Sequence, residues 1–276
     1  VILLPIFLRA FPKYRVLTLR DWATLVGLTL VSSVLGTLLF TEALARSFAS
    51  YDFATPVLLQ KLQPVFVIAL ATLFLKEHLS RRFLLLVPLA LIGSYMVSFG
   101  TDLVRPSLEG KFLVFVLAIG ASLAWGAGTI FSKKILTKLN FKEASAMRFL
   151  LAIPMSYLAM RILHDRYPIT DLTGGNILRF ILIACSTGAV AIIIYYRGLA
   201  TTPARVSTIA ELTFPIVSLL IAITALNPYG APQVLSGGQI FGVVVLLGSI
   251  LLISLDYARA AGETKNTEDG ILSEPL

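Results

Sequence analysis

Two charged side chains stand well inside apolar stretches of the sequence, and their positions suggest a binding site. Lys61 lies in the apolar run 53–75, and Glu211 lies in the run 206–226. An ionisable group held among apolar side chains is costly, so it usually faces the interior of a helix bundle and pairs there or contacts a ligand. We predict that both residues line a central cavity and pair across it. A buried structural ion pair without ligand contact is the alternative that the sequence leaves open.

Amide side chains beside Lys61 extend this candidate site. Gln60 and Gln63 flank the lysine and offer hydrogen-bond donors and acceptors to a polar ligand. They could equally hydrogen-bond a neighbouring helix. Glu211 could bind and release a proton, because burial raises the pKa of a carboxylate. Pairing with Lys61 would oppose this by favouring the charged form.

Arg148 and Trp125 complete the set of candidates. Arg148 stands about one turn inside the run 144–163, where its guanidinium could bind a ligand or extend to the surface of a membrane. Trp125 lies inside its own run and could line the cavity. Tyr195 and Tyr196 could also line an aromatic pocket, but their position near the end of a run is more typical of an interfacial aromatic belt.

The residues that enzymes and metal sites need are scarce. The two histidines, His78 and His164, lie between apolar runs, and Cys185 is the single cysteine. No metal-ligand spacing results, and Glu211 has no second carboxylate at similar depth for acid–base work. No G-x-x-x-x-G-K-[ST] segment is present to hold nucleotide phosphates. The sequence therefore argues against an enzyme, a cofactor and an ATP-driven pump.

The composition indicates a membrane protein. Hydrophobic residues make up 57% of the 276 residues and charged residues only 14%, with a mean hydropathy of +0.87. A soluble domain carries about 25% charge, because water must solvate its surface. The net charge of +8 comes from basic residues between the apolar runs, which fits basic cytoplasmic loops better than nucleic-acid binding.

The apolar runs have the length of transmembrane helices. Crossing the hydrocarbon core takes roughly 20 residues in a helix. Eight runs approach this length: 22–45, 53–75, 83–100, 111–131, 144–163, 178–196, 206–226 and 237–255. A ninth run, 1–11, is shorter and is expected to be the second half of a helix that begins before Val1. Because the runs are continuously apolar and too long for membrane strands, we predict an all-α bundle.

The basic residues predict the orientation of these helices. Alternating spans place 15 Lys and Arg residues at the connectors of one side and six at the other. The richer side should be cytoplasmic by the positive-inside rule. The tail, 258–276, is then cytoplasmic, and its polar composition predicts disorder.

Two stretches of the chain resemble each other at an offset of about 155 residues. The segment Glu42-Ala-Leu-Ala ends one span and Arg197-Gly-Leu-Ala ends another, and each is followed by a polar link and a helix with an early proline. We predict two repeats, 1–102 and 110–257, with five helices in the complete copy. Completing the first copy predicts ten helices in all.

The predicted repeats have opposite orientations. The proline helix of the first copy runs from outside to inside, and that of the second copy runs from inside to outside. Inverted repeats are a common construction of secondary transporters. Pro64 and Pro215 occupy matching places in the two copies, so we predict that they bend the helices beside the cavity. Packing kinks without function are the alternative.

With these features the sequence resembles the drug/metabolite transporter superfamily, in its EamA-type branch with two five-helix repeats. The resemblance lies in LGTLLFTEALARSFASYDFATPVLLQKLQPVFVIALATLFLKEHLS (35–80), in RFLLAIPMSYLA from Arg148 onward, and in the span with Trp125. One departure is Asn227-Pro228-Tyr229, which stands where the first copy has Lys76-Glu77.

The resemblance implies a secondary transporter in the plasma or inner membrane. Its cargo would be a small organic metabolite, often an amino acid, moved by alternating access and often outward. A channel and a non-transporting scaffold are the alternatives, although no span shows a ring-forming polar stripe or a filter loop. The expected partners are the solute and the lipid bilayer. The sequence leaves proton coupling and oligomeric state open.

Overall fold

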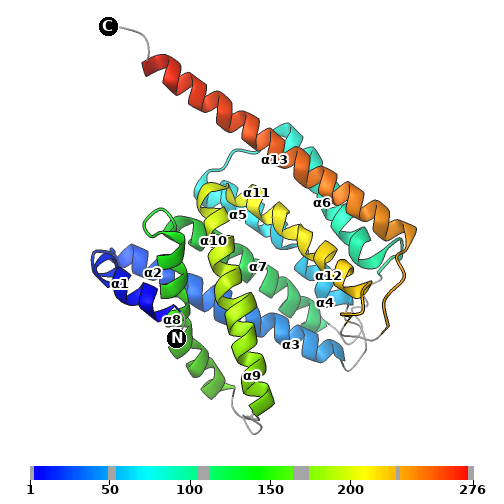
Figure 1. The fold of residues 1–276 in the computed structure, drawn as a ribbon, viewed down its shortest axis with the longest axis horizontal. Coiled ribbons are helices and arrows are strands. Elements are labelled where there is room, and N and C mark those ends of the chain that lie inside the picture. Colours follow the sequence, from blue (N-terminus) through cyan, green and yellow to red (C-terminus); the bar gives the residue numbers. More distant parts are fainter. Residues whose placement is uncertain (1–2, 49–53, 105–111, 164–173, 228–230, 273–276) are drawn as a thin grey trace. The chain divides into compact units, whose positions relative to one another are not determined.

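The fold consists of helices throughout the part of the chain that the computed structural model describes, which is residues 3–48, 54–104, 112–163, 174–227 and 231–272. Every regular element in these ranges is helical (Figure 1). Seven helical stretches are long and apolar enough to cross a membrane: Leu19–Ser47, Ala54–Leu75, Arg81–Phe99, Phe112–Ile135, Gly174–Thr201, Ala204–Ala222 and Gly237–Ala260. Such helices satisfy their backbone hydrogen bonds internally, as a bilayer requires. The predicted all-α, multi-pass membrane fold is confirmed.

Two predicted spans are helical but stand outside this set of seven. The run 144–163 forms α8 (Phe141–Ile162), whose 22 residues include four charged side chains that lower its mean hydropathy. The partial run 1–11 forms α1 (Leu4–Arg15), a helix of 12 residues. The total of ten helices stays a prediction.

The last helix extends beyond its predicted span. α13 (Gly237–Leu272) has 36 residues and continues past residue 255 into the segment expected to be a polar tail. Alanine, arginine, glutamate and lysine in this segment have high helix propensity.

The chain divides into two compact units, each built from two separate segments. The first unit consists of Val1–Leu75 and Leu108–Ala204, and the second of Lys76–Ser107 and Arg205–Leu276. Each unit thus takes helices from both predicted repeats, whose boundaries stay a prediction.

In the first unit, α7 (Phe112–Ile135) packs against most of the other helices. Small residues on α7 allow this close approach. A Cβ atom on Gly126 would lie 3.2 Å from that of Phe66, and one on Gly128 would overlap the side chain of Ser32. The neighbours of α7 are α2 (Leu19–Leu28), η1 (Thr29–Gly36), α3 (Thr37–Phe48), α4 (Ala54–Gln60), α5 (Gln63–Leu75) and α10 (Ala191–Thr201).

A second group of contacts attaches α1 and α8 to this unit. The side chain of Asn140 accepts hydrogen bonds from the backbone of Lys142 and Glu143, which fixes the start of α8. Glu143 is buried, and its carboxylate accepts a 2.6 Å hydrogen bond from Lys13 on α1. The fully buried ring of Tyr14 adds an apolar contact to the core formed by α1, α2, α7, α8 and α10.

The second unit is organised by an antiparallel helix pair, α6 (Arg81–Phe99) and α13, which lie side by side in Figure 1. Glycines bring the two backbones together. A Cβ atom on Gly93 would lie 2.7 Å from the backbone nitrogen of Leu246, and one on Gly242 would lie 2.7 Å from that of Val97. The remaining helix, formed by α11 (Ala204–Ala210), η3 (Glu211–Thr213) and α12 (Phe214–Ala222), packs on α6.

Candidate functional site

The span Ala54–Leu75 is interrupted at Lys61. α4 ends at Gln60, Lys61 and Leu62 form a turn, and α5 begins at Gln63. The backbone N–H groups of Lys61 and Leu62 donate to the carbonyls three residues earlier, at 3.0 and 3.1 Å, instead of four. Lys61 therefore stands at a break in a membrane span, and its side chain is half-buried, as are those of Gln60 and Gln63.

Proline chemistry and a neighbouring helix account for this break. Pro64 has no N–H to donate to the carbonyl of Gln60, so a regular helix would lose one bond there. Pro64 instead occupies the first turn of α5, where the missing donor costs little. The hydroxyl of Ser122 on α7 donates a 3.0 Å hydrogen bond to the carbonyl of Leu59, which supports the end of α4.

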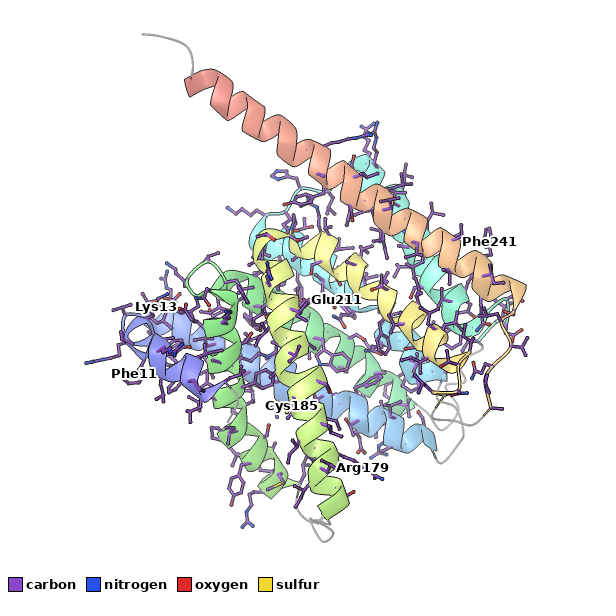
Figure 2. The ribbon with its side chains drawn as sticks, in the orientation of Figure 1. Phe11, Lys13, Arg179, Cys185, Glu211 and Phe241 are labelled. Atoms are coloured by element: carbon purple, nitrogen blue, oxygen red, sulfur yellow. The ribbon has the colours of Figure 1, made fainter. Side chains whose placement is uncertain are left out.

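The span Ala204–Ala222 in the second unit has a similar interruption. Glu211, labelled in Figure 2, begins the short 3₁₀ segment η3 between α11 and α12. Pro215 lies in the first turn of α12 and lacks the N–H that would reach the carbonyl of Glu211. Thr208, about one turn before Glu211, is fully buried, and its hydroxyl has no hydrogen-bond partner in the described part of the chain. Both predicted proline helices are thus interrupted next to a charged residue.

Two other spans contain π-helical stretches at a related spacing. These stretches are η1 (Thr29–Gly36) and η2 (Ala184–Val190), and both belong to the first unit. Their first residues are 155 positions apart, which is the offset of the predicted repeat. A π-helical stretch widens the helix and is frequent at functional sites.

Arg148 lies in the first unit at the meeting of α8, η1 and α10. Its Nε donates to the hydroxyl of Ser33 at 2.8 Å, Nη1 to that of Tyr196 at 2.9 Å, and Nη2 to that of Ser32 at 3.1 Å. The guanidinium also lies 5.7 Å from the ring centroid of Tyr196. These bonds use three of the five N–H groups of arginine. No ion pair joins Arg148 to any described carboxylate.

The position of Arg148 differs from the sequence expectation of one turn. Because α8 begins at Phe141, Arg148 is seven residues into the helix, about 10 Å along its axis. The interaction with Tyr196 was also missed, since a tyrosine near a run's end suggested an interfacial belt. The ring of Tyr196 is instead fully buried, and its hydroxyl shares a 2.8 Å hydrogen bond with Ser132 on α7. The sequence could not predict these contacts, because the hydroxyl residues that bond Arg148 lie on separate helices far apart in the chain.

Trp125 lies on α7 against the π-helical stretch η1. Its ring centroid is 5.2 Å from that of Phe40, and the two rings are tilted by 56°. A Cβ atom on Gly36 would lie 2.8 Å from the indole nitrogen, so only glycine leaves room for the indole there. Trp125 remains half-buried.

Comparison with known proteins decides the family, because residues 1–99 and 112–255 match the EamA-like transporter family. The chain belongs to this family. One relative is the riboflavin transporter ImpX of Fusobacterium nucleatum subsp. nucleatum, with 33% identity over 227 residues, which cover 82% of this chain and 74% of the relative. A crystal structure of another protein has the same fold, with a TM-score of 0.64, 16% identity, and coverage of 85% of this chain and 75% of the other.

In this EamA-like transporter, further polar contacts fix the ends of two spans. In the second unit, the carboxylate of Glu77 accepts from the backbone nitrogen of Arg205 at 3.1 Å and from its guanidinium at 3.4 Å. Each of these residues stands near the start of one of the two segments that form the unit. In the first unit, Lys133 donates to the carbonyls of Leu199 and Thr202 at 2.7 and 2.8 Å and caps the end of α10.

The span end with Glu77 has its counterpart at Asn227 in the second predicted repeat, and the contacts of that end are different. The side-chain amide of Asn227 donates to the carbonyl of Ala231 at 2.8 Å, and Pro228 and Tyr229 lie outside the described residues. Lys61 and Glu211 belong to separate units of this EamA-like transporter, and their predicted pairing stays a prediction.

Proposed function

We propose that this EamA-like chain is a secondary transporter of a small organic solute, with riboflavin as the first candidate. The observation that carries the proposal is the guanidinium of Arg148, held by three hydroxyls at depth in an apolar bundle. A charged group in such surroundings is costly and marks a functional site by default. The riboflavin transporter of F. nucleatum supports the choice of candidate, since it covers most of this chain at 33% identity.

The chemistry around Arg148 fits an oxygen-rich solute. Two N–H groups of the guanidinium lie beyond its bonds to described residues, and Ser32, Ser33 and Tyr196 add hydroxyls that donate or accept. Riboflavin carries ring carbonyls and a chain of hydroxyls that match these groups. Its flat ring system would find an aromatic partner in Trp125, which is half-buried on α7.

The interrupted spans supply the mobility that alternating access requires. Breaks beside Lys61 and Glu211 leave backbone groups outside regular helical bonding, as in transporters whose discontinuous helices form the binding site. We assign solute contact to Lys61, Gln60 and Gln63, and proton coupling to Glu211. The 155-residue offset between η1 and η2 supports an internal repeat, and inverted repeats are the arrangement that many alternating-access transporters use.

Direction and cargo are tested together in proteoliposomes with riboflavin, amino acids and nucleosides offered in turn. Saturable uptake with counterflow supports a carrier, and comparison of inward and outward gradients tests the expected export. Unsaturable conductance would instead indicate a channel, and absence of any flux a scaffold. Flux of another solute without riboflavin flux would remove riboflavin and leave the carrier in place.

Variants then test the assigned residues. Replacing Arg148 by glutamine removes the proposed charge-assisted hydrogen bond to the solute. Such a bond contributes about 1.5–3 kcal/mol, so kcat/KM should fall roughly 10- to 100-fold. Arg148→Lys keeps the charge without the planar fork and should recover only part of this loss. Arg179→Gln, at an exposed position on α9 (Gly174–Ile183), is the matched control. Unchanged transport and affinity in both Lys61→Met and Glu211→Gln would end their assignment.

A further inference from the structure

A groove in the second unit lies between the first turns of α6 and the corresponding part of α13. Its volume is about 350 Å³. It is lined by two arginines, one aspartate and four leucines: Arg82, Leu85, Leu86, Leu252, Leu255, Asp256 and Arg259. None of these residues belongs to the candidate solute site. The basic-residue count assigns this end of both helices to the cytoplasmic side.

The polar end of the groove carries an excess of positive charge. Asp256 accepts a 3.1 Å hydrogen bond from Ser80, and its other oxygen lies 3.7 Å from the guanidinium of Arg82. The Arg82 side chain is nonetheless 75% exposed. Arg259 forms no ion pair with any described side chain. The polar end thus carries two guanidiniums and one carboxylate, of which only Arg82 lies near the carboxylate, and both guanidiniums can bind an anionic oxygen group.

The other end of the groove is apolar and exposed. Leu85 is 72% exposed and Leu252 is 53% exposed, and both lie on helices that are long and apolar enough to cross the membrane. On α6, Leu85 and Leu86 lie about one turn after Arg82. On α13, which runs antiparallel, Leu255 and Leu252 lie about one and two turns before Arg259, so the leucines of both helices lie on the side of the membrane interior. A ligand that fills the groove thus needs an anionic group at one end and a hydrocarbon chain at the other.

We propose that this groove binds an anionic phospholipid of the cytoplasmic leaflet, with the phosphate between Arg82 and Arg259 and an acyl chain along the leucines. Basic pockets between helices on the cytoplasmic side are suited to such headgroups. A soluble phosphate would use the arginines but would gain nothing from the leucine wall. The site is independent of the transported solute.

The test measures lipid retention by native mass spectrometry. The purified protein is equilibrated with equimolar phosphatidylglycerol and phosphatidylcholine of identical acyl chains, and the ratio of bound lipids is recorded. Each arginine at a membrane surface contributes about fivefold to anionic lipid binding. The preference for phosphatidylglycerol should therefore fall about fivefold in Arg82→Gln or Arg259→Gln and roughly 25-fold in the double variant.

The control variant removes the same charge elsewhere. Arg161→Gln/Arg179→Gln changes two exposed arginines that the charge count places on the opposite side, and it should leave the preference within about twofold of the original. Equal losses in both double variants would mean general charge attraction and would overturn the proposal. An unchanged preference in Arg82→Gln/Arg259→Gln would overturn it as well.

Two further measurements use a variant that keeps both arginines and a soluble phosphate as competitor. Asp256→Asn removes the competing carboxylate without removing an arginine, so phosphatidylglycerol retention should rise severalfold, and no rise would contradict the site. Millimolar glycerol phosphate should fail to displace the lipid. Its displacement of phosphatidylglycerol would show a site for a soluble phosphate instead.

Discussion

The hydroxyl of Tyr196 links three helices through two hydrogen bonds, so Tyr196→Phe should destabilise the first unit strongly for a one-atom change. The hydroxyl accepts from Arg148 on α8 at 2.9 Å and shares a bond with Ser132 on α7 at 2.8 Å. The ring itself is fully buried and keeps its packing in the variant. Removal of the hydroxyl leaves the guanidinium of Arg148 and the hydroxyl of Ser132 without this partner in an apolar interior.

The expected magnitude follows from the two bonds. Hydrogen bonds between membrane helices contribute about 0.6 kcal/mol on average and up to about 1.7 kcal/mol. The bond to the guanidinium belongs near the upper value, because charge-assisted bonds are roughly twice as strong as neutral ones. The sum predicts a loss of about 2 kcal/mol in the free energy of unfolding. Tyr195→Phe, which removes a longer 3.3 Å bond to Thr129, should cost about 0.6 kcal/mol.

Reversible unfolding in mixed detergent micelles measures both variants. A double-mutant cycle with Ser132→Ala should show coupling of at least 0.5 kcal/mol, because the two residues share one bond. The reasoning is refuted if Tyr196→Phe costs no more than Tyr195→Phe, or if the Ser132 cycle is additive. Either result would mean that Arg148 and Ser132 find other partners at no cost.

Two further predictions concern helix packing and helix ends. Gly242→Ala places a Cβ atom 2.7 Å from the backbone nitrogen of Val97 and should lower the free energy of unfolding by about 1–3 kcal/mol. The control, Gly248→Ala, adds a Cβ atom with nothing within 4 Å and should be neutral or slightly stabilising. Equal effects of the two variants would contradict the close packing of α6 and α13. Lys133→Met removes the cap on the last carbonyls of α10, so amide hydrogen exchange near that end should rise several-fold, and unchanged exchange would show that the cap is not needed.

Part of the candidate site was predictable because proline acts locally. Pro64 and Pro215 lack a backbone N–H, and this alone predicts disturbed helices around them. The form of the disturbance was not predictable. The first span breaks into a turn at Lys61, where the Ser122 hydroxyl of α7 also bonds the carbonyl of Leu59, and the second span tightens into a 3₁₀ segment at Glu211.

The sequence by itself determined the membrane class, the approximate spans and the family resemblance, because bilayer thickness imposes a length and a composition that can be read along the chain. The charged residues within apolar runs could also be found in this way. Their surroundings could not, because a side-chain contact joins residues far apart in sequence. Arg148 meets Tyr196 and Ser32 only because α8, α10 and η1 pack together. The close packing at Gly242 and the groove beside Arg259 likewise exist only where two helices meet.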